Sequence, residues 1–393
     1  MDAIDLHHVR DDFPVTRRML YLDAAHQTPL ATSIRRGIEA FLEESNENAG
    51  PKPMWLGRVE AVRARAAAFL GAAPHELAFT KNTSEGLNIA ANALPLVAGD
   101  NVLMIEGDHP NNAYAWLNLA RKGVEVRFIR LHDGVADAAL FAPHIDARTR
   151  VISMSHVTFH AGHVHDLASI GALCRERGLY FVVDAMQSVG VVPIDVKALG
   201  ISLLAAGCHK GLLVPQGLGL LYADTRLTDL QPAYLAWASL ARPPADLIAN
   251  PADLAPAPGA ARFELGNFNL PGIHALDKAL NLIEGIGITN VHAHMQMLGD
   301  RLIEHLDRFG IGLVGPRTRA HRAHIYVLDL SAEPWLAYFA QHNARVSPER
   351  DGIRISFGIF NTREDIDRLA GLIYSHSPDR WADLSPADFR LTA

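Results

Sequence analysis

Lys210 is the residue whose surroundings point most directly to covalent chemistry. It follows an apolar segment at 203–206 and precedes a turn that is rich in Gly and Pro. Burial disfavours the charged ammonium group, so it lowers the pKa of a lysine and yields the neutral amine that forms imines. A surface lysine in a hairpin turn is the other interpretation, and this segment by itself leaves both open.

Two further segments place polar groups where α/β proteins bind ligands. Asp184 ends an apolar segment, with the amide of Gln187 three residues later, and ligands commonly lie at the carboxyl ends of parallel strands. Asn82, Thr83 and Ser84 stand directly before a helical pattern, where free backbone N–H groups attract phosphate. Each segment alone also fits an ordinary turn or helix cap.

Taken together, the three segments match the demands of pyridoxal 5′-phosphate. Its aldehyde needs an amine, its pyridine nitrogen an anionic partner, its 3′-oxygen a hydrogen-bond donor and its phosphate a helix dipole. A lysine, a carboxylate, an amide and a polar helix start are all present in this sequence. The sequence therefore predicts a site for this cofactor.

The middle of the chain predicts the elements that would position these residues. Helical patterns such as 111–121 and 167–177 alternate with short apolar strands, predicted at 102–105, 124–129, 151–154, 180–183, 203–206 and 218–222. Strands that are apolar on both faces and separated by helices are typical of a mostly parallel sheet with helices on both sides. The predicted fold class is α/β.

The second half of the chain differs in composition. Residues 238–261 are rich in Pro, Ala and Asp and predict a long loop, either a lid or a surface excursion. A smaller α+β domain follows, with helical patterns at 272–287 and 291–308, strands at 323–328 and 353–357, and a last helix from Thr362. We thus expect an N-terminal segment at 1–20, a large domain at 21–270 and a small C-terminal domain at 271–393.

Composition excludes several classes of protein. The 393 residues are 49% hydrophobic and carry a formal charge of -7, which argues against nucleic-acid binding. No apolar run reaches the roughly 18 residues of a membrane span. Two cysteines, Cys174 and Cys208, are too few for a disulfide scaffold, and the N-terminal residues do not resemble a signal peptide. We expect a cytoplasmic protein.

Three motifs resemble the class V aminotransferase family of fold-type I pyridoxal-phosphate enzymes. These are residues 183–190 around Asp184, residues 207–212 around Lys210 and the ending at 353–367. The family includes cysteine desulfurases, selenocysteine lyases and isopenicillin N epimerase-like proteins, and the likeness runs from residue 21 to residue 367. It implies a mostly parallel sheet of the seven-stranded type with flanking helices, plus the smaller C-terminal domain.

The resemblance also implies roles for individual residues in cofactor binding. Lys210 would be the Schiff-base lysine, Asp184 would pair with the pyridine N–H, and Gln187 would meet the 3′-oxygen. The phosphate would be held by His209 together with Thr83 and Ser84 at the helix start.

Further residues are implied to face the ring, the substrate or a second subunit. His109 would stack on the cofactor ring and join Lys210 and Asp184 as a catalytic candidate. Arg354 would hold the substrate carboxylate, and His26 either contacts the substrate or has a structural role. The segment 263–272, which includes Asn267, would reach the phosphate site of the neighbouring subunit and so implies a homodimer.

The sequence departs from the family pattern in ways that bear on the reaction. Gly207 and Asn267 replace hydroxyl residues of the phosphate site, and Phe159 replaces a common Asn near the 3′-oxygen. The segment 340–352 contains no cysteine, whereas a desulfurase needs a thiolate there. Cys174 lies in a helical stretch and Cys208 on the cofactor strand, so we do not expect a persulfide-forming cysteine desulfurase.

The expected function is an enzyme that acts on an amino acid through an external aldimine and Cα deprotonation. Transamination and β-elimination by a C–S lyase are the main candidates, and an epimerase is the alternative. A non-catalytic binding protein and a nucleotide-dependent oxidoreductase come from other classes, but the latter lacks the glycine fingerprint.

A cluster of histidines suggests a metal site instead. Its members are His156, His160, His163 and His165, with Asp166 beside them. Because the segment falls on the cofactor-adjacent loop of the family, we expect no metal.

Overall fold

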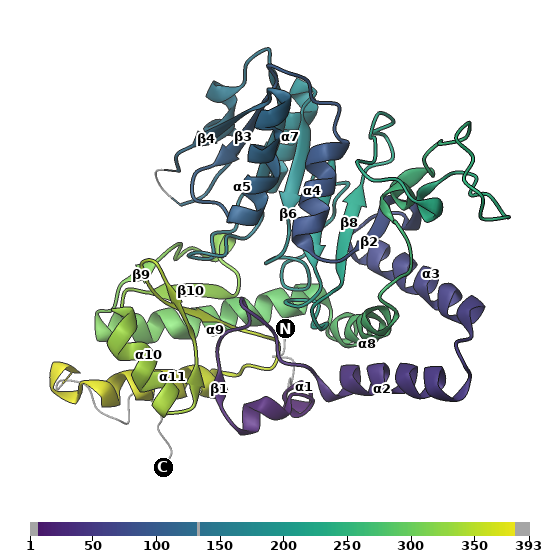
Figure 1. Ribbon diagram of the computed structural model, residues 1–393. Coiled ribbons are helices and arrows are strands. Elements are labelled where there is room, and N and C mark those ends of the chain that lie inside the picture. Colours follow the sequence, from purple (N-terminus) through teal and green to yellow (C-terminus); the bar gives the residue numbers. More distant parts are fainter. Residues whose placement is uncertain (1–6, 132–133, 382–393) are drawn as a thin grey trace.

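The computed structural model describes residues 7–131 and 134–381, which form a large α/β part and a smaller α+β part (Figure 1). The large part contains a seven-stranded sheet in the order β2-β8-β7-β6-β5-β3-β4. Strands β7, β6, β5, β3 and β4 run parallel, whereas β8 is antiparallel to both β7 and β2. The predicted fold class is therefore confirmed.

All six predicted strands of this sheet are present. Their bounds are β3 Asn101–Ile105, β4 Glu125–Ile129, β5 Thr149–Ser155, β6 Tyr180–Asp184, β7 Leu203–Gly207 and β8 Gly219–Ala223. The seventh strand, β2 Leu77–Thr80, was not predicted and forms one edge of the sheet. Nearly all residues of the inner strands are buried, as expected when helices cover both faces.

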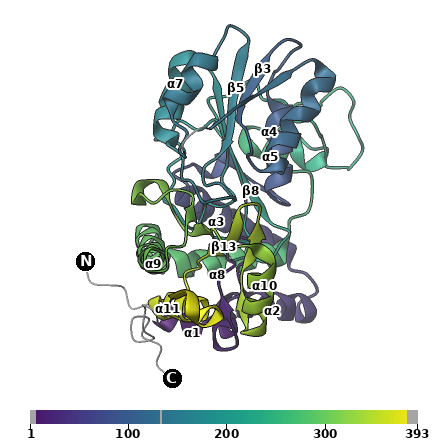
Figure 2. The same ribbon diagram turned by 90° about the vertical axis from the view of Figure 1, so that its left-hand side faces the viewer.

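Helices cover the two faces of the sheet, and the sheet divides the apolar core into two clusters. On one face lie α4 Thr83–Ala93 and α5 Pro110–Leu117, and on the other lies α7 Leu167–Arg177 (Figure 2). Asp166 caps α7 by accepting a hydrogen bond from the backbone N–H of Ser169, and Gly178 ends it in the left-handed conformation that glycine favours. A short helix, α6 Ala138–Phe141, precedes β5.

The smaller part is built on a four-stranded antiparallel sheet in the order β12-β13-β10-β9. Its strands are β9 Leu313–Val314, β10 Ile325–Leu328, β12 Ser347–Glu349 and β13 Gly352–Ser356. Its helices are α8 Leu270–Ile286, α9 Ile288–Phe309, α10 Ala332–Gln341 and α11 Arg363–His376. The predicted helix start at Thr362 is confirmed, because Thr362 and Asp365 form a capping box.

The N-terminal region joins both parts. After α1 His7–Asp11, strand β1 Leu20–Tyr21 pairs in parallel with β11 Ala344–Arg345 of the smaller part. Helices α2 Thr32–Glu47 and α3 Lys52–Phe69 then pack against α8. The expected domain limits at residues 21 and 271 remain a prediction.

The Pro-rich segment 238–261 forms a loop, as predicted. Its regular structure is limited to two single turns, Trp237–Ser239 and Gly259–Phe263, and a bridge between Leu240 and Pro256. The loop stands out from the body of the large part (Figure 1). It exposes apolar side chains, including Leu247 and Ile248.

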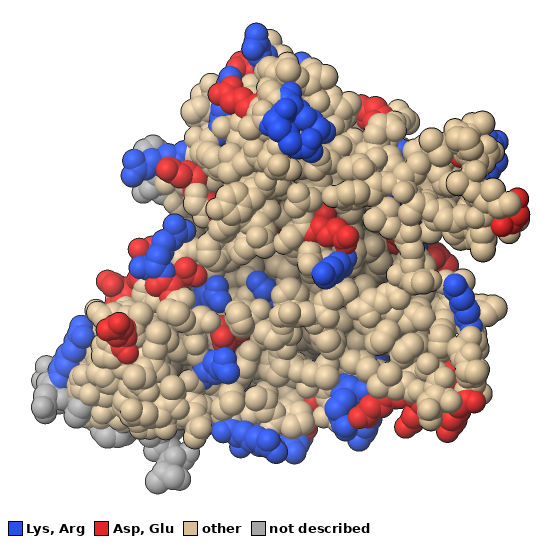
Figure 3. Space-filling view, viewed as in Figure 1, with Lys and Arg blue, Asp and Glu red and all other residues tan. Residues whose placement is uncertain are grey.

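The surface has no extended region of one charge on the face shown in Figure 3, where acidic and basic side chains are interspersed. Within the described residues, no helix is both long and apolar enough to cross a membrane.

Candidate active site

A cavity of about 560 Å³ lies at the carboxyl ends of the central strands. It is lined by strand ends, by the turn after β7 and by the starts of α4 and α5. Eight of the ten residues predicted from sequence line it: His26, Thr83, Ser84, His109, Asp184, Gln187, His209 and Lys210. None of the described lining residues comes from the loop 238–261, and both interpretations of this loop remain predictions.

Lys210 is held in the cavity by its backbone. The single hydroxyl proton of Thr28 is shared between the carbonyl oxygens of Lys210, at 2.8 Å, and His209, at 3.1 Å. Burial, and then the positive charge of Arg354, lower the pKa of Lys210 to about 8. Among the described residues, no hydrogen bond or ion pair engages its Nζ atom, so the amine is free to react.

Asp184 ends β6 on the floor of the cavity. Its Oδ1 accepts a hydrogen bond from the backbone N–H of Met186 at 2.9 Å. Burial, and then the nearby charge of Asp108, raise its pKa to about 7. A buried carboxyl of this kind would gain from a cationic partner, and the pyridinium nitrogen of the predicted cofactor is such a partner.

Asp108 lies beside the cavity, next to Asp184, and was not predicted from the sequence. Its carboxylate accepts hydrogen bonds from the hydroxyl and backbone N–H of Ser155, at 2.5 Å and 2.8 Å, and from the amide of Asn112. Ser155 is paired with Asp184 across β5 and β6, so the two acids lie side by side. The position of Asp108 three residues after a predicted strand could have identified it.

The start of α4 faces the cavity with free donors. Asn82 caps the helix through the N–H of Glu85, and Thr83 and Ser84 line the cavity. The first N–H groups of a helix have no partner within it, so this end suits a phosphate. The hydroxyl of Thr83 donates to the sulfur of Met186 at 2.8 Å, a weak acceptor that a phosphate oxygen would replace well.

The structure gives a reason for the glycine at position 207. A Cβ atom there would lie 2.9 Å from the sulfur of Met186 and 3.2 Å from both the Thr83 hydroxyl and the Nδ1 of His209. The backbone N–H of Gly207 approaches the same sulfur at 3.2 Å. Met186 thus fills the space that a side chain at 207 would need, which accounts for the departure from the family pattern.

Three further predicted residues surround the amine. Burial lowers the pKa of His209 to about 4, and burial together with Lys210 lowers that of His109, so both rings are neutral near pH 7. The Nδ1 of His109 accepts a hydrogen bond from the N–H of Asn111, and its ring meets Phe159 edge to face. His26 is exposed on the wall of the cavity.

Gln187 carries an orphaned polar atom that tests the fit of the cofactor. Its Nε2 donates to the carbonyl of Ala25 at 3.0 Å, whereas its buried Oε1 has no partner. Unpaired buried acceptors are costly, so this oxygen is suited to a ligand hydroxyl. With the free amine, the buried carboxyl and the helix start, the residues present fit pyridoxal 5′-phosphate.

Arg354, on β13, lies beside the cavity rather than among its lining residues. Its Nη1 donates to the carbonyl of Phe159 at 3.2 Å, and its buried Nε has no partner. Asp23 and Glu349 lie 3.7 Å and 3.5 Å from its guanidinium nitrogens. Figure 2 shows β13 where the smaller part meets the large part.

Asn267 is not brought into this cavity. It is exposed and lines a separate cavity of about 230 Å³, formed by residues 263–269 and the segment before α4. The two cavities share Lys81 and Gly217. Within one chain, Asn267 therefore lies next to the phosphate end of the site and not in it.

Neither cysteine reaches the cavity. Cys174 is buried on α7, and burial raises its pKa to about 12. Cys208 directly follows β7, two residues before Lys210, where it is buried, and burial raises its pKa further. Both thiols are therefore protonated and shielded at neutral pH.

The clustered histidines have structural surroundings. The Nδ1 of His165 accepts a hydrogen bond from the N–H of Ala136, and burial lowers the pKa values of His156, His163 and His165. Across residues 7–131 and 134–381, no group of three or more His, Cys, Asp or Glu side chains is arranged to hold a metal ion.

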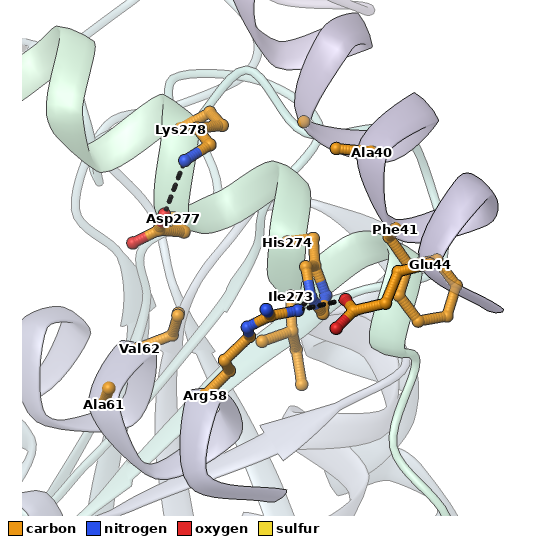
Figure 4. A pocket seen from close by; sticks show the side chains of 11 residues that line it. Ala40, Phe41, Glu44, Arg58, Ala61, Val62, Ile273, His274, Asp277 and Lys278 are labelled. Carbon is orange, nitrogen blue, oxygen red and sulfur yellow. Dashed lines mark hydrogen bonds and ion pairs between the residues drawn. The ribbon is translucent and has the colours of Figure 1, made fainter. Parts of the chain in front are cut away.

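A further cavity, of about 430 Å³, lies between α2, α3 and α8 (Figure 4). Its polar groups are paired with one another: the guanidinium of Arg58 contacts Glu44 and His274, and Lys278 contacts Asp277. None of the predicted site residues lines it, so we place the chemistry in the cavity around Lys210.

The chain is similar to known proteins over most of its length. The family model for class-V aminotransferases matches residues 20–369. An uncharacterized aminotransferase of Schizosaccharomyces pombe is 34% identical over 90% of each chain. A probable cysteine desulfurase of Methanothermobacter thermautotrophicus is 33% identical, over 75% of this chain and 74% of the relative. The apo structure of a cysteine desulfurase from Thermococcus onnurineus has a TM-score of 0.87 at 24% identity, covering 96% and 99% of the two chains.

Proposed function

Because the chain belongs to the class-V aminotransferase family and is a pyridoxal 5′-phosphate-dependent enzyme, we propose that it carries out transamination or β-elimination on an amino acid, without a cysteine persulfide on the enzyme. The cavity around Lys210 supplies the residues for Cα chemistry. The proposal that no persulfide forms on the enzyme rests on the absence of a reactive thiol from this cavity.

We assign the cofactor contacts from the groups left free in the cavity. Lys210 would hold the aldehyde carbon, Asp184 the pyridine nitrogen, and the start of α4 with Thr83 and Ser84 the phosphate. His209 and Gln187 would contact the phosphate and the 3′-oxygen, and His109 would cover the ring. When bound, the cofactor supplies an electron sink that acidifies the Cα–H bond of the amino acid.

The protein residues then move one proton and orient the substrate. A lysine whose pKa is lowered to about 8 is partly neutral near pH 7–8, so the Nζ of Lys210 can accept the Cα proton. Arg354 would hold the substrate carboxylate through two of its N–H groups, which fixes the Cα–H bond toward Lys210. The carboxylate of Asp184 would keep the pyridine nitrogen protonated.

The state of the two cysteines disfavours a desulfurase, although several relatives bear that name. A persulfide carrier must be a thiolate that can reach substrate sulfur, because the thiolate is the nucleophile. Cys174 and Cys208 are buried, their pKa values are raised, and neither lines the cavity. The turn between β12 and β13, at 350–351, carries an arginine and an aspartate.

A panel of amino acids tests the proposal. We expect the holoenzyme to release a keto acid from an amino acid, or sulfide and a keto acid from a sulfur-containing one. The variants Cys174→Ala and Cys208→Ala should retain this activity within about two- to threefold. A persulfide detected by mass spectrometry on either cysteine during turnover would refute the proposal, and conversion to the opposite enantiomer alone would favour an epimerase.

We further propose that the enzyme is a homodimer in which Asn267 of each subunit completes the partner's phosphate site. Asn267 is exposed beside, but outside, the cavity of its own chain. The neighbouring Leu265 is also exposed, although it is a large apolar residue. A second copy covering this segment would bury both side chains.

Substitutions at these two positions test the dimer. Leu265→Arg should shift the protein toward monomers in analytical ultracentrifugation. Asn267→Ala should leave the dimer intact but weaken cofactor affinity about three- to tenfold, because one hydrogen bond to a charged group is lost. A monomeric wild type that binds the cofactor fully would contradict the proposal.

A further inference from the structure

The carboxylate of Glu349 is placed where a substrate carboxylate would bind. Its Oε2 lies 3.5 Å from the Nη1 of Arg354, and only 13% of the side chain is exposed. Glu349 ends β12, directly before the turn that leads into β13. Ser347 is the residue paired with Arg354, and Glu349, two residues later on the same face of β12, is its diagonal neighbour. The negative charge of Glu349 also acts on His109, which lines the cavity.

Two other groups make only weak contacts with Glu349. Its Oε1 accepts a hydrogen bond from the backbone N–H of Arg350 at 3.2 Å and lies 3.6 Å from the Nδ1 of His160. His160 makes a closer contact, of 2.9 Å, with Asp351 on the same turn. Glu349 thus has a second partner beside it, toward which its side chain could turn.

The pair formed by Arg354 and Glu349 differs from a structural ion pair of this same protein. Arg63 and Glu264 are similarly buried and form two hydrogen bonds of 2.6 Å and 3.1 Å. Arg354, by contrast, makes only long contacts with acids and leaves its buried Nε without a partner. A guanidinium that offers a free N–H edge in this way is prepared for a bidentate carboxylate.

Asp23 is the other acid at Arg354, and it is fixed in place. It is 2% exposed, accepts a hydrogen bond of 2.6 Å from the hydroxyl of Ser347, and bridges to the strand end at Ser356. Its nearest approach to Arg354 is 3.7 Å. Glu349, at the end of a three-residue strand, is therefore the acid that can be displaced.

We propose that Glu349 is an internal carboxylate ligand of Arg354, which an incoming amino acid must displace. The inference rests on the proposed role of Arg354 in substrate binding. Glu349 occupies the arginine when no substrate is present and raises the concentration of carboxylate needed to fill the site. Removal of its charge should then strengthen the binding of carboxylates and leave uncharged analogues unaffected.

Two small probes of nearly equal shape make the test specific. Propionate carries the carboxylate and propionamide does not, and calorimetry on the holoenzyme measures the binding of each without turnover. Glu349→Gln should lower the Kd for propionate about tenfold, while the Kd for propionamide should stay within about twofold. Asp351→Asn is the matched control, because it removes an equal charge from the same turn but not from Arg354.

The outcomes separate this inference from the proposed function. If Arg354→Gln leaves propionate binding unchanged, the carboxylate does not bind at Arg354 and the proposed role of this arginine fails. If Arg354→Gln abolishes propionate binding while Glu349→Gln leaves it unchanged or weaker, Glu349 is not a competitor and only the inference is overturned. Equal effects of Glu349→Gln on both probes, or the same effect from Asp351→Asn, would also overturn it.

Discussion

Replacement of Lys210 by methionine is expected to abolish covalent attachment of the cofactor and to lower turnover by roughly 10²–10⁴-fold or more, because the base is lost. Methionine keeps the length of the side chain and its apolar contacts, so the loss reports on the amine. Lys210→Arg should be equally inactive, since it restores the charge but not the nucleophile. The visible absorption of the holoenzyme and its bleaching by borohydride measure the attachment.

The same substitution should stabilise the protein without cofactor. The pKa of Lys210 is lowered to about 8, so the folded protein carries a disfavoured charge below that pH. Wild-type stability should rise between about pH 8 and pH 10.5, where the unfolded chain binds the proton and the folded one does not. At pH 7, Lys210→Met should therefore add up to about 3 kcal/mol to the free energy of unfolding.

Exposed Lys122 provides the control for both measurements. Lys122→Met should leave activity, cofactor attachment and the free energy of unfolding nearly unchanged. If Lys210→Met retained the covalent cofactor band, the assignment of the reactive amine would be wrong. If the Lys210→Met apoprotein were less stable than the wild type, burial of the Lys210 charge would not be the source of instability that we infer.

The sequence predicted the parallel core of the sheet well, for a physical reason. Strands such as β6 Tyr180–Asp184 and β7 Leu203–Gly207 are buried on both faces, so they stand out as continuous apolar segments. Strand β2 Leu77–Thr80 has only four residues between polar neighbours and gave no such pattern. Its place depends on pairing with β8, a contact between residues far apart in the chain.

The site residues that lie at the ends of strands could be predicted from the sequence. Asp184 and Lys210 end or follow neighbouring strands, and β6 and β7 run parallel, so their carboxyl ends meet. The loose contact of Arg354 with Glu349 depends on how two short strands of the smaller part pair, which no local pattern reveals. The contact by which Met186 fills the space beside Gly207 could likewise be found only from the three-dimensional packing.

Replacement of Asp184 by asparagine, like that of Lys210 by methionine, should stabilise the apoprotein while it lowers the activity of the holoenzyme. In the protein without cofactor, the pKa of Asp184 is raised to about 7 by burial and by Asp108. The folded protein therefore binds this proton more tightly than the unfolded chain, and wild-type stability should fall as the pH rises from about 4 to 7. Asparagine cannot ionise and keeps the oxygen that accepts the N–H of Met186.

We accordingly expect Asp184→Asn to raise the free energy of unfolding of the apoprotein by up to about 4 kcal/mol at pH 8, and to change it little at pH 4. Turnover of the holoenzyme should fall at least about 100-fold, because a neutral amide cannot keep the pyridine nitrogen protonated. Exposed Asp246 supplies the control, since Asp246→Asn should alter neither quantity. Full activity in Asp184→Asn would show that Asp184 does not act on the cofactor. A change in stability that does not depend on pH would show that burial of the Asp184 charge is not the cause.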